Sequence, residues 1–135
     1  MIRQATAEDV PRVAEMAMRF IAAAGKPEGR PAEVEAVVCG MVGGGGCFVS
    51  ERGMILGIVA PLYYRPDYLE AHEVAWWCED GAGLRLLRAF EQWARDRGAR
   101  EIVMSTLPDY TARGAHAVLT RRGYRHAEAG YRKAI

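Results

Sequence analysis

The spacing of apolar positions in the first third of the chain predicts two amphipathic helices. After a short strand at residues 2–5, Thr6 and Asp9 stand three positions apart, as an N-cap and the third residue of a helix do. Apolar residues then recur at helical spacing: Val10, Val13, Met16, Ala17, Phe20 and Ile21. Glycine and proline in residues 25–29 end this helix, and a second helix is predicted from Pro31 to Met41.

The middle of the chain has the alternation that strands require. Residues 47–51 and 54–60 are predicted to form a hairpin around Arg52 and Gly53. Residues 61–70 are predicted to be a loop, and residues 71–78 a further strand rich in Val and Trp. Alternation along that strand assigns its side chains to two faces, His72, Val74, Trp76 and Cys78 on one and Glu73, Ala75 and Trp77 on the other.

The second half of the chain predicts a strongly amphipathic helix after a glycine-bearing turn at residues 79–83. Its apolar stripe consists of Leu84, Leu87, Phe90, Trp93 and Ala94, and its water-facing side of Arg88, Glu91, Arg95 and Asp96. A buried strand at 101–105, a helix at 110–122 and two short closing strands within 124–135 follow. The order β-α-α-β-β-β-α-β-α-β-β predicts an α/β (α+β) fold, and the length fits one domain over residues 1–135.

Composition narrows the class of protein. The chain is 50% hydrophobic and 26% charged, an ordinary globular balance, and its formal net charge of +1 argues against nucleic-acid binding. The chain has three widely spaced cysteines, Cys39, Cys47 and Cys78, and no C-x-x-C motif. This pattern does not favour disulfides, so reduced thiols in the cytoplasm are predicted. The cysteines and the three scattered histidines lack metal-ligand spacing, so no metal is expected. The opening residues are polar, and no apolar run is long enough for a membrane span.

Two glycine-rich segments invite a phosphate-binding interpretation. The run 43–46 lacks the lysine and hydroxyl residue of a phosphate-binding loop, and it is predicted to be a plain helix-to-strand connection. Residues 79–83 differ because they join a strand directly to the N-terminus of a helix. Unpaired backbone N–H groups and the positive end of a helix dipole suit an anion there, and Gly81 and Gly83 leave room for it.

The sequence resembles the GNAT superfamily of N-acetyltransferases along nearly its full length. Three stretches carry the resemblance: residues 2–9, residues 81–99 with Gly81-Ala82-Gly83-Leu84-Arg85, and Arg121-Arg122-Gly123-Tyr124. The resemblance implies a mixed, mostly antiparallel, twisted sheet of about six to seven strands flanked by about four helices. It also implies acetyl-CoA as co-substrate, with pantetheine held near Trp76, Trp77 and Cys78 and the pyrophosphate held by the amides of Gly81, Ala82, Gly83, Leu84 and Arg85.

The implied reaction is the transfer of an acetyl group to a primary amine by direct attack. An ammonium acceptor must lose a proton first, and Glu73 is the first candidate for the base, with Glu70 behind it. The alternative for Glu73 is an ordinary ion-paired strand glutamate. Members of the family often carry a tyrosine that protonates the departing thiolate, and Leu119 occupies that position here. Tyr110 is therefore the candidate general acid, with His116 as a substitute. Cys78 is expected to be a small core residue, the alternative being a covalent nucleophile.

Several alternatives stay open at this stage. The acidic pair Glu79 and Asp80 falls beside the expected pyrophosphate, where it would repel an anion unless both side chains point away. That pair and Leu119 favour a rival hypothesis, a catalytically impaired acyl-CoA-binding or protein-interaction module. The acceptor could be a small molecule or a protein amine. A homodimer is an alternative to a monomer, and no membrane partner is expected.

Overall fold

The computed structural model describes residues 1–25, 27–106, 110–128 and 130–135, without the side chains of residues 110–113. The chain divides into two compact units, Met1–Ser105 and Thr106–Ile135. The first holds one sheet with its helices, and the second holds the helix α4 (Tyr110–Arg121) and the chain that follows it. In the part of the chain that is described, no helix has the length and apolar character needed to cross a lipid bilayer.

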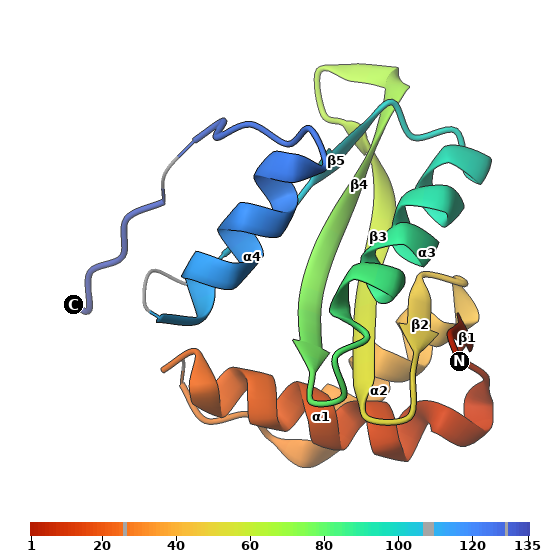
Figure 1. Ribbon diagram of the computed structural model, residues 1–135, viewed down its shortest axis with the longest axis vertical. Helices are drawn as coiled ribbons and strands as arrows, with labels where there is room; N and C mark the ends of the chain where they lie inside the picture. The colour runs from red at the N-terminus through yellow and green to blue at the C-terminus, as the bar shows by residue number, and fades with distance from the viewer. Residues whose placement is uncertain (26, 107–109, 129) are drawn as a thin grey trace. The chain divides into compact units, whose positions relative to one another are not determined.

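The sheet has five strands that follow one another across it in chain order (Figure 1). They are β1 (Arg3–Gln4), β2 (Cys47–Val49), β3 (Gly53–Leu62), β4 (Arg65–Cys78) and β5 (Glu101–Val103). The first four pair in antiparallel fashion, and β5 runs parallel to β4. The predicted hairpin around Arg52 and Gly53 is confirmed, since Val49 lies opposite Met54.

The strand predicted over 71–78 begins six residues earlier, at Arg65. Leu62 pairs with Arg65, so that Tyr63 and Tyr64 alone make a tight turn. The loop predicted over 61–70 is therefore wrong, and Asp67 and Tyr68 are strand residues. A long hairpin allows this because it satisfies the backbone groups of the whole segment by pairing with β3.

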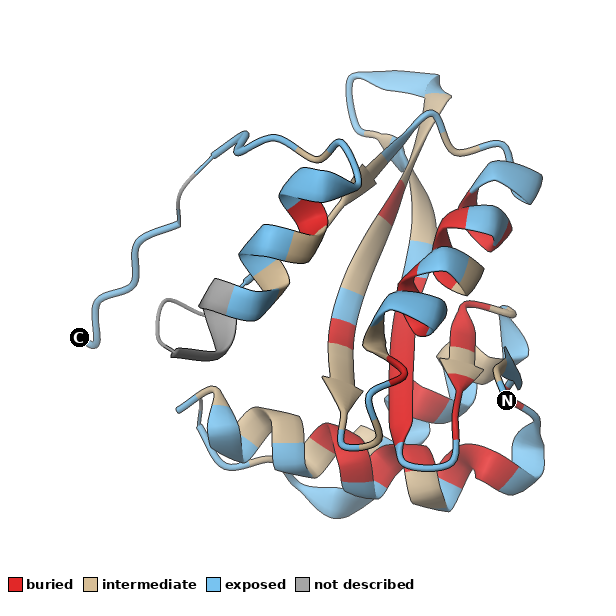
Figure 2. Cartoon of the chain, viewed as in Figure 1, coloured by how far each residue is buried: buried red, intermediate tan, exposed pale blue. Residues whose placement is uncertain are grey.

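Helices α1 (Val10–Ala23) and α2 (Pro31–Gly43) cover one face of the sheet, and α3 (Gly83–Asp96) covers the other. Leu56 belongs to the core cluster with residues of α1 and α2, whereas the neighbouring Gly57 lies under the ring of Phe90 from α3. Successive strand residues face opposite sides, which places the two groups of helices on opposite faces. Buried positions accordingly concentrate on β3 and on the sheet-facing sides of α1 and α3 (Figure 2).

The start of the first helix follows the sequence prediction closely. A 3-10 turn, η1 (Ala7–Asp9), precedes α1, and the Thr6 N–H donates to Oδ2 of Asp9 over 2.9 Å. The Asp9 carboxylate also accepts from Arg3, at 2.7 and 2.8 Å, and from Arg12, at 3.2 Å. Asp9 is 6% exposed, and these donors explain how a carboxylate can be buried there.

The helix α3 departs from its predicted stripe at two positions. Leu84, predicted to be buried, is 38% exposed in the first turn, and Leu86 is buried instead. Glu91, predicted to face water, is 3% exposed. Its position, four residues after Leu87 and three before Ala94, puts it on the buried side of the helix, so spacing prevailed over polarity.

The two closing strands predicted over 124–135 do not form in the residues described there, 124–128 and 130–135. The sheet consequently has five strands, and the prediction of six to seven is wrong. Ala, Arg, Lys and Glu dominate this segment, and it contains a single β-branched residue, Ile135. It therefore offers little of the alternating apolar surface that stabilises a strand.

Candidate functional site

The sheet opens between β4 and β5. These strands pair only from Glu70 opposite Glu101 to His72 opposite Val103, after which β5 leaves β4 (Figure 1). Along residues 73–78 no strand among the described residues covers this side of β4. Alternate residues of an antiparallel strand direct their N–H and C=O groups away from the paired neighbour. This edge therefore offers backbone donors and acceptors to an extended polar ligand.

A β-bulge lies at the start of this open edge. Leu56 lies opposite Ala75 and Gly57 opposite Glu73, so Val74 is an extra residue on β4. Cross-strand partners share a face, and the bulge therefore shifts the alternation by one residue. Glu73 shares the α3 face with Gly57, whereas the sequence placed it with Ala75 and Trp77. That face assignment is corrected by the bulge.

Glu73 lies where the two strands separate. It follows His72, the last β4 residue paired with β5, and it is half-buried. The Ser105 amide nitrogen lies 3.5 Å from its Oε1, so the carboxylate reaches toward the chain that leaves β5. Glu70, the second candidate base, has Oε1 at 3.3 Å from Nε2 of His72 within the paired part of the strand.

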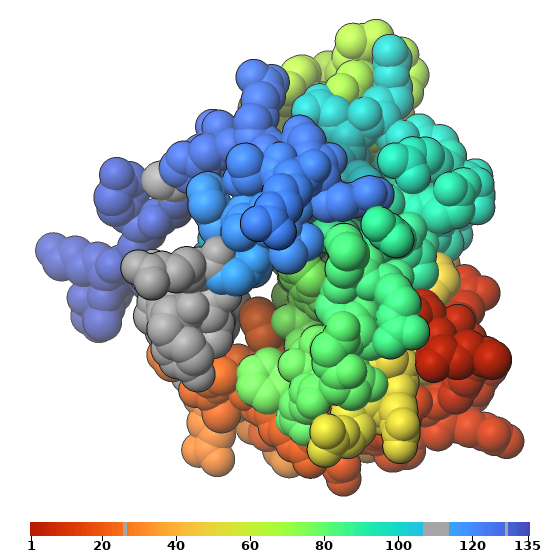
Figure 3. Space-filling view, viewed as in Figure 1, coloured from red at the N-terminus to blue at the C-terminus, as the bar shows by residue number. Residues whose placement is uncertain are grey.

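The N-terminus of α3 lies at the end of the same edge. The chain turns at Gly81, whose φ of +73° favours glycine, and the helix begins at Gly83. Ala82 is the N-cap and provides no side-chain hydrogen bond. The segment is at the surface of the face shown in Figure 3 (green). The first turn contains no acidic residue, and it carries the exposed side chain of Arg85.

The amides of this turn are not equivalent. The Ala82 N–H faces Sγ of Cys78 at 3.1 Å and Oδ1 of Asp80 at 3.3 Å, so it is already engaged. The first amides of an α-helix have no acceptor within the helix. Gly83, Leu84 and Arg85 occupy those positions, and their N–H groups suit an anion together with the helix dipole.

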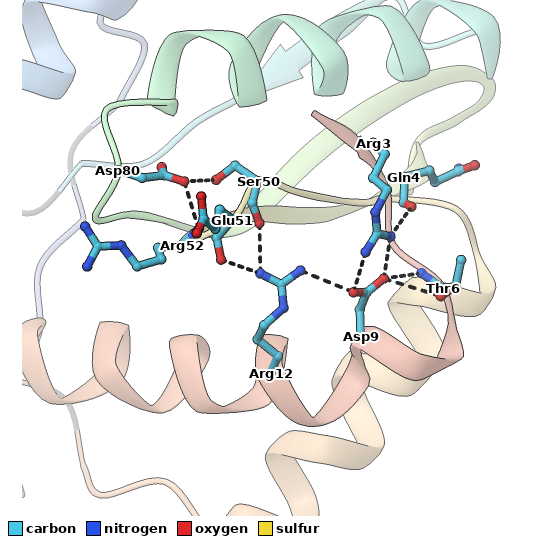
Figure 4. A network of polar contacts seen from close by, with 9 residues as sticks. All are labelled: Arg3, Gln4, Thr6, Asp9, Arg12, Ser50, Glu51, Arg52 and Asp80. Atoms are coloured by element: carbon cyan, nitrogen blue, oxygen red, sulfur yellow. Dashed lines mark hydrogen bonds and ion pairs between the residues drawn. The ribbon is translucent and has the colours of Figure 1, made fainter. Parts of the chain in front are cut away.

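Both neighbouring carboxylates are already bound by donors, and only Asp80 reaches the helix end, through Oδ1 and the Ala82 N–H. Asp80 Oδ2 accepts from Oγ of Ser50 and from the Arg52 N–H, each at 2.8 Å (Figure 4). The Arg52 amide, with Ser50 and Cys78, holds the pKa of Asp80 well below its usual range. Glu79 Oε1 accepts from Nε1 of Trp77 at 2.8 Å and from Arg19 of α1 at 3.2 Å. Glu79 therefore points away from the helix end, as the sequence analysis required, whereas Asp80 Oδ1 stays within 3.3 Å of the Ala82 nitrogen.

Trp76 and Cys78 line the α3 side of the strand end. The Trp76 Nε1 atom is buried and has no partner among the described residues, and it lies close to Gly83. Such an indole N–H can donate to a ligand oxygen without giving up another hydrogen bond. Partial burial, together with the hydrogen bond to Asp80, raises the pKa of the Cys78 thiol. A raised pKa keeps the sulfur protonated, which disfavours a covalent role.

The candidate acid lies in the second unit. Tyr110 begins α4, and its side chain lies outside the described residues. His116, the substitute, is an exposed residue of the same helix. Its backbone carbonyl accepts from Oγ1 of Thr120 at 2.8 Å.

A pocket of about 540 Å³ lies on the opposite face of the sheet, between α1, α2 and the bulge. Most of its wall is apolar, and the charged side chains that line it are Glu28 and Arg30 from the connection between the two helices and Glu33 from α2. The lining residues are Ala17, Phe20, Ile21, Glu28, Gly29, Arg30, Glu33, Val34, Val37, Val38, Leu56, Val74 and Ala75. The bulged Val74 thus borders the pocket, while its neighbour Glu73 faces the other side.

Sequence reasoning missed this pocket and the role of Ser50 and Arg52. The apolar residues of α1 and α2 were correctly predicted to be helical, but their spacing does not distinguish a packed face from a pocket wall. Ser50 and Asp80 are 30 positions apart, and no local pattern marks such a contact.

Solved structures with the same fold span nearly all of the chain. A candidate acetyltransferase from Arthrobacter sp. FB24 has a TM-score of 0.74 at 22% identity, covering 99% of this chain and 96% of that one. A predicted acetyltransferase from Clostridium acetobutylicum, solved with acetyl-CoA, has a TM-score of 0.75 at 12% identity and covers 99% and 95%. An aminoglycoside acetyltransferase from an uncultured soil sample has a TM-score of 0.71 at 12% identity and covers 100% and 97%.

Sequence comparison gives no such match. No family model matches the chain, and neither does any curated protein. Identities of this size, below a quarter of the aligned residues, establish shape and not chemistry. The chain shares its fold with these solved acetyltransferases.

Proposed function

We propose that this protein is an acetyl-CoA-dependent N-acetyltransferase that acts on a primary amine. One observation carries the proposal: the open edge of β4 ends at an α3 N-terminus that has no side-chain cap and whose two neighbouring carboxylates are both bound by other donors of the protein. An open strand edge suits the amide groups of pantetheine, and an uncapped helix start suits a pyrophosphate. The acetyltransferase fold supports the same conclusion.

The cofactor would extend along this edge toward α3. Backbone groups of Trp76, Trp77 and Cys78 would bind pantetheine, and the amides of Gly81, Gly83, Leu84 and Arg85 would bind the pyrophosphate. The Ala82 amide, the fifth that the sequence assigned, would be available only after release from Cys78 and Asp80. The buried Nε1 of Trp76 would donate to an oxygen of the ligand.

Glu73 would act as the base. The acceptor ammonium gives one proton to the Glu73 carboxylate, and the free amine attacks the thioester carbonyl carbon. As the N–C bond forms and the C–S bond breaks, the electron pair leaves on the CoA sulfur, and the nitrogen releases its second proton to water. A thiolate with a pKa of about 8.5 is a workable leaving group, and Tyr110 is the candidate to protonate it. A backbone N–H of residues 76–78 would stabilise the oxyanion.

The α1–α2 pocket would receive the body of the acceptor, and because the pocket lies on the face opposite Glu73, the amine would pass the open edge of β4 to reach that carboxylate. Its walls are apolar, which favours an amine attached to an aliphatic or aromatic group. Arg30 pairs with Glu33 at 3.3 Å, so among the described residues that line the pocket the Glu28 carboxylate is left as an unbalanced negative charge. That charge would attract a cationic amine rather than a carboxylate-bearing acceptor.

Calorimetric titration with acetyl-CoA of the wild type and of Gly83→Ala, Gly83→Gln and Gly83→Glu tests the proposal. A Cβ at Gly83 would lie 3.6 Å from the nearest atom, of Trp76, so the fold accommodates a side chain there. Glutamate in the first helical turn stabilises a helix by about 0.3–1 kcal/mol. The expected result is that Gly83→Glu keeps or raises the Tm but weakens acetyl-CoA at least about tenfold, because its carboxylate competes for the same amides.

The matched variants separate charge from bulk. Gly83→Ala adds a methyl group where the glycine leaves room for the anion, so it is expected to bind acetyl-CoA somewhat more weakly than the wild type, with Gly83→Gln weaker than Gly83→Ala and Gly83→Glu weakest. Equal binding by Gln and Glu would contradict an anion site at this turn. Wild-type protein that binds acetyl-CoA but acetylates none of a panel of apolar amines would favour the impaired binding module over the enzyme.

A further inference from the structure

The turn between β2 and β3 is joined to the candidate cofactor loop by a single carboxylate. Asp80 accepts four hydrogen bonds, two at each oxygen. Its Oδ2 receives Ser50 Oγ and the Arg52 N–H, both at 2.8 Å, and its Oδ1 receives Cys78 Sγ at 3.1 Å and the Ala82 N–H at 3.3 Å. One side chain thus links the turn to the residue that caps α3.

The turn is itself fixed from its other side. Arg12 of α1 donates to the carbonyl oxygens of Ser50 at 2.8 Å and Glu51 at 2.7 Å, and its second nitrogen lies 3.2 Å from Asp9 (Figure 4). Ser50 is 5% exposed, and its own N–H donates to the Gly53 carbonyl over 3.0 Å. Asp80 therefore anchors the loop to a part of the molecule that is held in place independently.

We propose that Asp80 is a positioning residue that sets the orientation of the α3 N-terminal amides through the β2–β3 turn. The inference rests on the proposed function, because the ligand whose binding it serves is acetyl-CoA. The Asp80 side chain fixes the Ala82 amide and, with it, the direction in which the next amides of α3 point. Its negative charge is neutralised locally by its four donors, one of which is the Ala82 N–H at the start of α3.

The chemistry of the four donors makes asparagine an informative substitution. A carboxylate has two acceptor oxygens, whereas a carboxamide has one oxygen and one NH₂ group. Backbone N–H groups, which cannot rotate, face both oxygens of Asp80: Arg52 at Oδ2 and Ala82 at Oδ1. In Asp80→Asn one of these N–H groups must face the NH₂ group, so either the turn or the helix cap loses its bond. The variant removes the link with almost no change of shape.

Charge and positioning predict opposite changes in affinity. If Asp80 acted only through its charge, Asp80→Asn would bind the anionic cofactor more tightly, because a nearby negative charge is removed. If it positions the loop, the variant binds more weakly. We expect the Kd for acetyl-CoA to rise about tenfold or more in Asp80→Asn and about threefold or more in Ser50→Ala. Glu79→Gln, a neighbouring carboxylate bound to Trp77 and Arg19, is the matched control and should bind equally well or more tightly.

Amide hydrogen exchange of the ligand-free proteins provides the second measurement. The Ala82 amide should exchange faster in Asp80→Asn and Ser50→Ala, with exchange in α1 unchanged, which separates a loosened loop from an unfolded protein. If the wild type binds acetyl-CoA and Asp80→Asn binds it equally well or more tightly, the inference about Asp80 is overturned while the proposed function stands. If the wild type failed to bind acetyl-CoA, the proposed function would be overturned, and the role of Asp80 in that binding would fall as well.

Discussion

The ring of Phe90 packs directly on the backbone of Gly57, with no room for a side chain between them. A Cβ at Gly57 would lie 2.7 Å from two ring atoms of Phe90 and 2.3 Å from the carbonyl oxygen of His72. Gly57 lies opposite Glu73, so this contact sets how closely α3 approaches the strand that carries the candidate base. The glycine is a packing requirement of the site's framework.

Gly57→Ala should therefore destabilise the protein by about 1–3 kcal/mol, because helix or strand must move to admit the methyl group. Urea unfolding followed by circular dichroism measures the change. Gly40→Ala is the control, since a Cβ there meets nothing within 4 Å and the residue lies inside α2. That substitution should stabilise by about 0.5–1 kcal/mol. Equal effects of the two changes would contradict the packing account.

Glu73→Gln should lower kcat with an active amine about 100-fold or more while leaving the KM for acetyl-CoA unchanged, because it removes a base and no cofactor contact. The acidic limb of the pH–rate profile should disappear with it. Glu70→Gln is the matched control, three residues away on the same strand and paired with His72. A larger loss in Glu70→Gln than in Glu73→Gln would assign the base to Glu70.

Val74→Ser should raise the KM for an apolar amine about three- to tenfold with little change in kcat, because the apolar wall of the pocket loses part of its area. Ile58→Ser is an exposure-matched control, since Val74 and Ile58 are both 43% exposed and Ile58 does not line the pocket. Steady-state kinetics with amines of increasing chain length measures the effect. A parallel change in both variants would argue that the pocket does not bind the acceptor.

Acid should weaken the fold through Asp9. The hydrogen bond from Arg3 holds the pKa of Asp9 well below its usual range, so the folded state favours the ionised carboxylate more than the unfolded state does. The resulting stability is fully present above the unfolded pKa of about 3.9, and it is lost as the pH falls through the lower folded value.

Asp9→Asn should accordingly cost about 2 kcal/mol of unfolding free energy at pH 7, since bonds to two guanidinium groups are lost. The deficit relative to wild type should shrink below about pH 4. Glu15→Gln, an exposed position of α1, should behave as the wild type at both pH values. A deficit that stays constant down to pH 2 would contradict this account. Urea unfolding at several pH values provides the measurement.

Local patterns predicted most of the secondary structure, and the reason is visible in particular residues. Thr6 and Asp9 form the predicted helix start because a cap depends on residues three positions apart. The sheet-facing side of α3 was correct at Leu87, Phe90 and Trp93, whose spacing matches the helical repeat. The segment before α3 was identified as the candidate anion site for the same local reason.

The errors arose where distant residues decide. Nothing in the alternation of residues 71–78 marks Val74 as an extra residue, because the bulge exists only in the pairing with β3. The orientation of Asp80 depends on Ser50 and Arg52, which lie in another hairpin. The two closing strands were predicted within residues 124–135, a segment with little apolar surface to bury.

The bulge at Val74 makes β4 more sensitive to insertions and deletions than to substitutions. The extra residue turns Glu73 toward α3 and leaves its neighbour bordering the pocket on the other face. Replacement of Val74 alters only a pocket wall, but deletion of one codon would restore the alternation and reverse every side chain on one half of β4. The number of residues between His72 and Ala75 should therefore be constrained more strongly than their identities. In a library of variants, substitutions here should survive where single-residue insertions and deletions do not.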